Sequence, residues 1–444
     1  MGVTLEVKNG KGENESSGAD VEVAGVKKTI PISNLEGATH LFKGSVGAGL
    51  FAMGDCFKNG GLIGASLLLP VLAVICVHCE RLLIQGSILA VERTPGVEFF
   101  DYPDTVEKVF EYGPPCMRKF SKLMRTIVET FLCVTQFGFC AIYFVFITEN
   151  LHQVLLQNGV EISSAATMAI TLLPAMLPSL LTNLKYISPV SMLANVSLLF
   201  GIFATLTIAL QGPLPSPSER HFFTNGSQLA LFFGTALFSY EGIALILPLR
   251  NKMRNPESFT TPFGVLNVTT GIITLLFIFT GFIGYLRWGE NVEGSITLNL
   301  DSNDVLSQVV KIVAATGVFM GYPIQFFILI KIIWVPLKQS SRAAQQYPIT
   351  LQVILRFFLV LGTFGVAVLV PKLSLFISLI GAFCSTSLAF LIPVILDFLM
   401  RAGVPKALTA WVFLKNMAII VIALLGIAIG TYQSILEIVK EFYG

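Results

Sequence analysis

Apolar segments long enough to cross a membrane recur along the whole chain. A bilayer core about 30 Å thick requires about 20 consecutive, mostly apolar residues in each helix. Helix caps, prolines and charged residues mark the limits of about eleven such segments. They are expected at residues 37–57, 62–88, 123–148, 165–183, 187–211, 227–249, 260–286, 305–333, 351–370, 373–399 and 408–432. The pattern therefore predicts an all-helical integral membrane protein whose transmembrane domain covers residues 35–432.

The ends of the chain differ from this domain. Residues 1–34 are rich in Gly, Ser, Glu and Lys and have no apolar core, so we expect a disordered tail there. They also lack an apolar segment followed by a small-residue cleavage site, which argues against a removable signal peptide. Residues 433–444 are expected to form a short tail on the opposite side of the membrane.

Composition narrows the class of partner. The chain is 54% hydrophobic and only 13% charged, with a mean hydropathy of +0.76, so membrane lipids are its expected surroundings. Its formal net charge is +2, and the sequence has no concentrated basic face for phosphate contacts. We therefore expect no nucleic-acid partner.

Lysine and arginine placement predicts the orientation. These residues are concentrated before the first segment and in alternate connections, and such connections stay in the cytosol. The amino terminus is therefore expected in the cytosol and the carboxyl terminus outside. Asn225-Gly226-Ser227 is the sequon that falls in an outer connection, so Asn225 is a candidate for N-glycosylation.

Two of the apolar segments carry sequences that interrupt a helix. The first contains Gly44, Gly47 and Gly49, which leave little helix-favouring sequence from Ser45 to Ala48. The sixth carries the polar run Ser239–Gly242 in its middle. Inside a bilayer, unwound backbone is tolerated only where it lines a cavity or is buried in protein. These breaks therefore indicate a site near the middle of the membrane.

A broken helix leaves amide groups free on one half and carbonyl groups free on the other. The pair suits an amino acid zwitterion, which has a carboxylate and an amine a few Å apart. Segments one and six occupy corresponding positions if the first ten segments form two inverted five-helix repeats, and such paired breaks are typical of secondary transporters. The alternative for the glycines is close helix packing.

Two ionisable residues lie beside the breaks. Glu241 stands in mid-segment, where a carboxylate costs about 2.5–3.5 kcal/mol on insertion scales, so it is expected to be neutral, partnered or exposed to water. His40 lies about one turn before the first break and titrates near neutral pH. We interpret both as proton-coupling residues, although Glu241 could instead bond loose amides and His40 could be merely interfacial. Gln136 and Gln325 could line the pathway or bridge helices.

Four stretches of sequence resemble the proton-coupled amino acid transporters of the amino acid and auxin permease group, in the amino acid-polyamine-organocation superfamily. The stretches are THLFKGSVGAGLFAMGDCFKNGG, TIVETFLCVTQFGFCAIYFVFITEN, GTALFSYEGIALILPLRNKMRNPESF and GYLRWGENVEGSITLNL. The resemblance runs from about Ala38 to Tyr432. It implies the five-plus-five inverted-repeat fold named for the bacterial leucine transporter, with one further helix, and proton-driven uptake of small neutral amino acids such as glycine, alanine and proline.

The resemblance also implies roles for particular residues. His40 matches the histidine implicated in proton coupling, Gly44 to Gly49 match the substrate-carboxylate loop, and Ser239 to Gly242 match the facing loop. The sequence departs from the family pattern at Gly54, where proline is usual, and at Arg250, where an acidic residue is usual. It also departs at Leu329 and Lys331, where relatives tend to have proline and glutamate.

The expected mechanism is alternating access around a site at the midplane, driven by protons and without any other cofactor. The substrate carboxylate would meet the amides of the first break, its amine the carbonyls of the second, and its side chain nearby aromatic rings. The predicted substrate-binding residues are Gly44, Ser45, Val46, Gly47, Ala48, Gly49, Phe137, Phe238, Ser239, Tyr240 and Gly242.

Other classes of function fit the sequence less well. It has no metal-ligand spacing, nucleophile elbow or phosphate loop, so we expect neither an enzyme nor a metal site. The main alternative is an amino acid sensor that binds substrate with little or no net flux. The plasma membrane is the favoured location, and an endosomal or lysosomal membrane is the alternative; the oligomeric state is left open.

Overall fold

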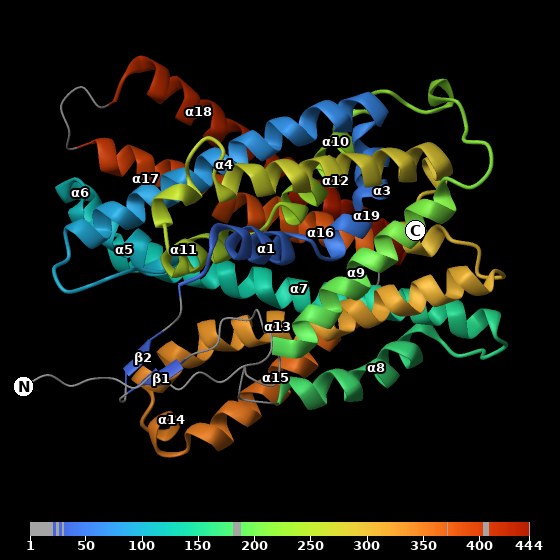
Figure 1. The fold of residues 1–444 in the computed structure, drawn as a ribbon, viewed down its shortest axis with the longest axis horizontal. Coiled ribbons are helices and arrows are strands. Elements are labelled where there is room, and N and C mark those ends of the chain that lie inside the picture. Colours follow the sequence, from blue (N-terminus) through green and yellow to red (C-terminus); the bar gives the residue numbers. More distant parts are fainter. Residues whose placement is uncertain are drawn as a thin grey trace, which may run out of the picture.

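The protein is a bundle of helices. The computed structural model describes residues 21–23, 26–28, 31–180, 188–370, 372–402 and 408–443, and nearly all of them are helical (Figure 1). The all-α fold predicted from the apolar segments is thereby confirmed. Most of the predicted amino-terminal tail, residues 1–34, lies outside the described residues. The described part of this tail contains one small antiparallel pair of strands, β1 (Val21–Val23) and β2 (Val26–Lys28).

The helices follow the predicted segments in chain order. Their bounds are α1 (Asn34–Ser45), α2 (Ala48–Phe51), α3 (Met53–Gly60), α4 (Leu62–Glu92), α5 (Tyr102–Tyr112), α6 (Pro115–Arg118), α7 (Ser121–Gln157), α8 (Ser164–Ser179), α9 (Ser188–Ala209), η2 (Pro217–Glu219), α10 (Gly226–Ser239), α11 (Ile243–Lys252), η3 (Pro256–Phe259), α12 (Val265–Trp288), η4 (Gly289–Asn291), η5 (Ile296–Asn299), α13 (Val305–Ser340), α14 (Arg342–Gln346), α15 (Pro348–Leu369), α16 (Leu373–Ile380), η6 (Gly381–Ser385), η7 (Ser387–Leu391), α17 (Ile392–Arg401), α18 (Ala410–Leu425), η8 (Gly426–Gly430) and α19 (Thr431–Tyr443).

Eight helices in the described part of the chain are long and apolar enough to cross a membrane. They comprise α4, α7, α10 with α11, α12 with η4, α13, α15, the run from α16 to α17, and the run from α18 into α19. The shorter apolar helices at 164–179 and 193–209, together with α1–α3, lie at the remaining predicted positions. The structure therefore establishes eight spans by length, and the count of eleven stays a prediction. The final helix also continues to Tyr443, past the predicted end of the last segment at residue 432.

Both predicted breaks are present. The first break separates α1, which ends at Ser45, from α2, which begins at Ala48. The second separates α10, which ends at Ser239, from α11, which begins at Ile243. The halves α1 and α11 lie on one side of the breaks, and the halves α2–α3 and α10 lie on the other.

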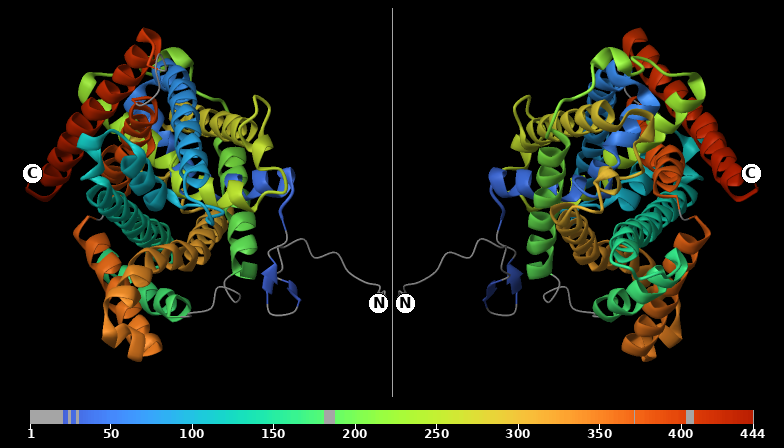
Figure 2. Two further views of the ribbon diagram at one scale, coloured as in Figure 1. Left: turned by 90° about the vertical axis from the view of Figure 1, so that its left-hand side faces the viewer. Right: turned by 90° about the vertical axis from the view of Figure 1, so that its right-hand side faces the viewer.

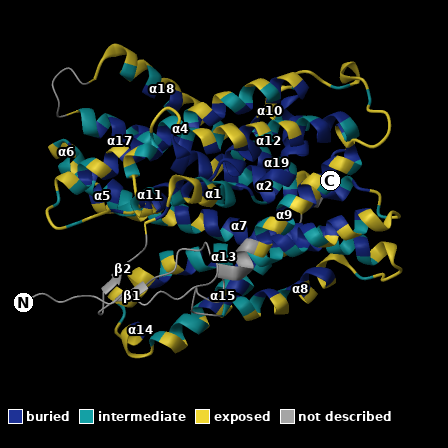
Figure 3. Ribbon diagram, viewed as in Figure 1, coloured by how far each residue is buried: buried dark blue, intermediate teal, exposed yellow. Residues whose placement is uncertain are grey.

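The interrupted helices occupy the interior of the bundle. In Figure 1, α1 lies between α12 above and α7 below, and α7 packs along α13. Figure 2 looks along the bundle and shows the carboxyl-terminal helices on one flank and α9 on the opposite one. Figure 3 shows that this interior is also the buried part of the molecule, because the residues around α2, α7 and α10 are mostly buried. Exposed side chains on the outer helices include large apolar ones such as Phe358 and Leu424, as expected of a surface that faces lipid.

Backbone hydrogen bonds join the start of α1 to the end of α11, the ends of these two half-helices that lie away from the breaks. The Ile32 amide donates to the Lys252 carbonyl at 2.9 Å, and the Arg254 amide donates to the Ile32 carbonyl at 2.9 Å. Just after this bridge, Ser33 caps α1 by accepting from the Glu36 amide at 3.3 Å, while the Glu36 carboxylate accepts from the Ser33 amide at 2.6 Å. The start of α1 is thereby tied to the end of α11, and α1 packs against α11.

A glycine contact brings α10 against the π-helical segment η6. A Cβ on Gly381 would lie 1.8 Å from the Gly234 carbonyl oxygen, and a Cβ on Gly234 would lie 2.3 Å from the Ser378 carbonyl oxygen. Only glycine fits at both positions, because the two backbones touch. π-helical turns are rare and are frequently found at functional sites, and this one lies against α10, the first half of the second broken helix.

Candidate functional site

A cavity of about 210 Å³ lies beside the two breaks. Its walls come from α1, α7, α9, α11 and α13, together with the residues of both breaks. The lining residues are His40, Lys43, Gly44, Val46, Gln136, Phe139, Tyr143, Ala194, Asn195, Leu198, Glu241, Gly242, Ala244, Leu245, Gly321, Ile324, Gln325 and Ile328. Drug-sized ligands occupy clefts of about 300–1,000 Å³, so this cavity suits a smaller metabolite.

Helical spacing explains how separate stretches of sequence reach one cavity. On α7, Gln136, Phe139 and Tyr143 are spaced i, i+3 and i+7, which places them on one face of the helix. On α13, Gly321, Gln325 and Ile328 follow at i, i+4 and i+7. Each helix thus presents one stripe to the cavity and turns its other faces to the core or the lipid.

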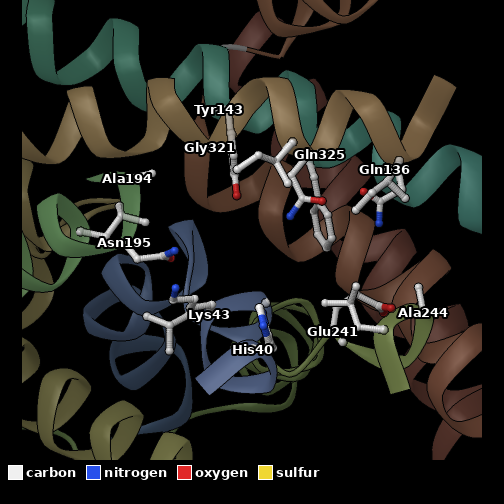
Figure 4. Close-up of a pocket in the computed structure, with 18 residues that line it drawn as sticks. His40, Lys43, Gln136, Tyr143, Ala194, Asn195, Glu241, Ala244, Gly321 and Gln325 are labelled. Carbon is white, nitrogen blue, oxygen red and sulfur yellow. The ribbon is translucent and has the colours of Figure 1, made fainter. Parts of the chain in front are cut away.

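The polar groups of the cavity stand on two opposing walls. Figure 4 shows Gln136 and Gln325 on one side and His40 and Glu241 on the other. Gln136 is 5% exposed and Glu241 is 8% exposed. The Gln136 Oε1 and Glu241 Oε2 atoms are buried and have no hydrogen-bond partner among the described residues. Buried oxygens of this kind cost free energy unless a ligand, a water or a proton satisfies them.

The cavity lies on the α1 and α11 side of the breaks. His40 is exposed and Lys43 is partly exposed, and both line this side of the cavity together with Gly44. No residue of α2, α3 or α10 within the described chain lines it. With the predicted orientation, this is the cytosolic side.

The opposite halves of the broken helices are packed together. The Ser239 hydroxyl donates to the Thr235 carbonyl at 2.8 Å and lies 3.3 Å from the Gly49 carbonyl. A Cβ on Gly49 would lie 2.9 Å from the Ser239 Cα, so this contact also depends on glycine. The α2 and α10 halves are therefore closed against each other while the α1 and α11 halves border a cavity.

Five of the predicted site residues line the cavity: His40, Gly44, Val46, Glu241 and Gly242. The structure brings together the two predicted proton-coupling residues with backbone from both breaks. Gly47 lies directly behind the wall, because a Cβ on it would be 3.4 Å from the Tyr143 hydroxyl.

The other predicted substrate-binding residues lie outside the cavity lining. Ser45 hydrogen-bonds the Leu41 carbonyl at 3.0 Å, and Ala48 is buried with Gly49 and Ser239 in the closed halves. Phe238 packs edge-on against Phe139, with ring centroids 4.8 Å apart.

Phe137 is one residue after Gln136, so it points to another face of α7. Its ring lies against Gly362 of α15, where a Cβ would approach it to 3.2 Å. This placement puts Phe137 outside the cavity lining.

Tyr240 points away from the cavity in this structure. Its hydroxyl donates to the Leu69 carbonyl at 3.3 Å and to Thr274 Oγ1 at 3.0 Å, and its ring packs against Phe277 at 5.3 Å. We therefore expect Tyr240→Phe to leave the apparent affinity for substrate within about twofold, while it lowers the free energy of unfolding by about 1 kcal/mol through the lost hydrogen bonds. Substrate titration and thermal unfolding of the same preparation measure both quantities. A large loss of affinity at unchanged stability would instead place the hydroxyl in the substrate site.

Sequence reasoning missed Lys43, Tyr143 and Asn195 as cavity residues. Lys43 was detectable as the residue one turn from His40, and Tyr143 as the residue two turns from Gln136 on the same helical face. Gln136 and Gln325 were singled out, and the structure places both on the cavity wall.

The residues that depart from the family pattern lie outside the cavity lining. Leu329 is fully buried in the core, and Lys331 is exposed. Gly54 packs against η5, where a Cβ would lie 2.6 Å from Ile296 Cγ2, so the close contact itself calls for glycine. None of these residues, nor Arg250, lines the cavity.

A second cavity, of about 490 Å³, lies among α3, α10, α16 and α19 on the other side of the breaks. Asn225 borders it and is exposed. The Asn225 Oδ1 atom accepts from the Gln228 amide at 3.0 Å and so caps α10. Glycosylation of Asn225 stays a prediction. Within the described residues, no group of three or more His, Cys, Asp or Glu side chains is placed to hold a metal ion.

Comparison with known proteins identifies relatives over most of the chain. The sequence profile of the family described as "Transmembrane amino acid transporter protein" matches residues 31–436. The chain is 32% identical over 413 residues to the "Proton-coupled amino acid transporter-like protein pathetic" of Drosophila melanogaster, a match that covers 93% of this chain and 86% of that protein. It is 28% identical over 309 residues to "Vacuolar amino acid transporter 4" of Saccharomyces cerevisiae, covering 66% of this chain and 39% of that protein.

Among solved structures, the chain is similar to MhsT in complex with L-phenylalanine. The TM-score is 0.49 at 14% identity, and the superposition covers 90% of this chain and 98% of MhsT.

Proposed function

Because this chain belongs to the transmembrane amino acid transporter family, we propose that it carries small neutral amino acids such as glycine, alanine and proline across a membrane by proton symport. Membership makes it a multi-pass membrane transporter for amino acids, and not an enzyme. The finer statement on substrate and coupling ion draws support from the cavity and from the name of the Drosophila relative.

The observation that carries the proposal is the cavity at two broken helices with a buried carboxyl group on its wall. The carbonyl end of α1 and the amide end of α11 both reach it, through Val46 and Gly242. Helix ends of opposite polarity provide for the amine and the carboxylate of a zwitterion. Val46 and Tyr143 separate this space from the amides that begin α2, so we propose that the substrate carboxylate reaches Gly47 to Gly49 when these side chains move.

Glu241 is the proposed proton site. Its carboxyl group is buried on the cavity wall, within hydrogen-bonding reach of Ser385 on η6. Ionisable groups inside a membrane domain commonly serve as proton relays. His40 is exposed on the same cavity, so it is proposed to pass the proton between Glu241 and the aqueous phase. A proton on Glu241 would permit the loaded carrier to turn, and its release through the open cavity would accompany release of the substrate.

Proton coupling supplies enough free energy for accumulation. One positive charge moving through 100 mV contributes about 2.3 kcal/mol, and each pH unit adds about 1.4 kcal/mol. These contributions together support an accumulation of roughly a hundredfold or more.

Uptake of labelled glycine, alanine and proline by proteoliposomes tests the proposal. With an imposed inward proton gradient and no sodium, we expect accumulation above equilibrium. His40→Ala is expected to lower the initial rate by roughly tenfold, since proton exchange with water is slowed, whereas the matched control His221→Ala, at an exposed connection, is expected to keep it. Binding of these amino acids without flux under any gradient would favour a sensor.

The plasma membrane is the proposed location. The name of the yeast relative refers to the vacuole, which supports an endosomal or lysosomal membrane as the alternative. Microscopy of a fluorescent fusion with markers for both membranes separates them.

A further inference from the structure

The cavity wall opposite the breaks carries an unusual set of side chains for a membrane interior. Gln136 of α7 and Gln325 of α13 line it, whereas Asn195 of α9 lies toward the other end of the cavity, near Lys43 (Figure 4). With the Tyr143 side chain, three primary amides and a phenol from three helices thus line one cavity.

The hydrogen-bonding capacity of this wall is incompletely used. The Tyr143 hydroxyl and the Gln325 amide lie within hydrogen-bonding reach of each other. The Gln136 side chain is 5% exposed, and its Oε1 is buried without a partner among the described residues. A helix-bridging role would pair that oxygen with a donor on a neighbouring helix. The free acceptor faces the cavity, so a donor on a ligand can bind it in place of water.

The charge distribution limits what that ligand carries. Within the described lining, every charged or titratable side chain other than Tyr143 stands on α1 or at the second break: His40, Lys43 and Glu241. The lining residues of α7, α9 and α13 contribute no charged side chain, and Phe139, Leu198 and Ile324 supply apolar surface beside the amides. Such a wall suits an uncharged side chain with an apolar stem and a polar end.

We infer that the cavity selects neutral amino acids whose side chains carry an amide or a hydroxyl group, such as glutamine, asparagine, threonine and serine, over apolar side chains of the same size. This inference rests on the proposed function, because it assigns the substrate side chain to the same cavity. The substrate backbone would lie at the breaks, and its side chain would donate to Gln136 Oε1 and exchange hydrogen bonds with Gln325. A side chain without a donor would leave Gln136 unpaired, and sites built to hydrogen-bond their ligand discriminate strongly against analogues that lack the group.

Ligand-induced thermal stabilisation of the purified full chain tests the inference, because it reads binding whether or not transport occurs. The probes are pairs of similar shape: threonine with valine, and glutamine with norleucine. We expect the polar member of each pair to bind about tenfold more tightly or better. Gln136→Leu is expected to reduce that preference below about threefold. The matched control Gln352→Leu, on α15 and outside the cavity lining, is expected to retain it.

Equal affinity for both members of each pair would overturn the inference, and so would a preference that survives Gln136→Leu unchanged. Stabilisation by none of the four amino acids would overturn it as well. Uptake of labelled alanine is measured separately on the same preparation. If alanine is taken up but binding does not distinguish the members of each pair, only the inference on the side chain is refuted. If binding is selective but alanine is not taken up, only the proposed transport is refuted.

Discussion

Glu241→Gln is expected to abolish accumulation of amino acid against its gradient while it leaves exchange of substrate across the membrane intact. Glutamine has nearly the shape of glutamic acid, so the packing around the second break is preserved, but its amide takes up no proton at neutral pH. With one pH unit imposed, the parent should accumulate alanine about tenfold from the chemical gradient alone, and the variant should reach a ratio of about one. Alanine uptake by proteoliposomes measures the first quantity, and counterflow from preloaded vesicles measures the second.

Glu257→Gln is the matched control, because Glu257 is exposed in η3 and lies outside the cavity lining. It should behave as the parent in both assays. Accumulation by Glu241→Gln at the level of the parent would show that the driving proton binds elsewhere.

Gly49→Val is expected to stop transport. The Cβ of any residue at this position would lie 2.6 Å from Ser239 Oγ and 2.9 Å from Ser239 Cα, and the second of these atoms belongs to the backbone. The halves α2 and α10 would be pushed apart, which costs about 1–3 kcal/mol by analogy with overpacked cores. The conformation that closes these halves would then be depleted, and counterflow should fall at least tenfold, since about 1.4 kcal/mol shifts a population tenfold.

Gly365→Val provides the comparison, because a Cβ on Gly365 of α15 would meet nothing within 4 Å. It should retain most of the counterflow rate of the parent at equal protein content. Normal counterflow by Gly49→Val would mean that closure of α2 on α10 is unnecessary for the transport cycle.

Much of the architecture was predictable because its signals are local in sequence. Glycines at 44, 47 and 49 and the polar run from Ser239 to Gly242 weaken helix formation wherever they occur. The breaks were therefore predicted within a residue or two of where α1 and α10 end. His40 and Glu241 were predicted as residues of the site for the same reason, since each lies in or near a break.

Which side chains line the cavity was less predictable. Tyr240 directly precedes Glu241, yet its hydroxyl bonds Leu69 and Thr274 while Glu241 lines the cavity. That choice depends on how the unwound turn is oriented against α4 and α12, which no local pattern encodes. Gln136 lines the cavity and the adjacent Phe137 does not, because one residue of helix turns the direction of the side chain by about 100°.

The remaining cavity residues come from helices distant in sequence. Asn195 and Tyr143 line the same cavity as His40 only because α9, α7 and α1 all border one space. A polar residue within an apolar segment indicates a pathway or a helix contact, and only the assembled bundle separates the two.

Proton entry that depends on substrate tests the central claim most directly. Sodium-free proteoliposomes that enclose a pH-sensitive dye are held at equal pH on both sides, with a potassium gradient and valinomycin to make the interior negative. On addition of alanine we expect the interior to acidify, and we expect no acidification with Glu241→Gln. Alanine uptake without acidification of the parent would contradict proton symport, and acidification without alanine would indicate a proton leak in place of coupling.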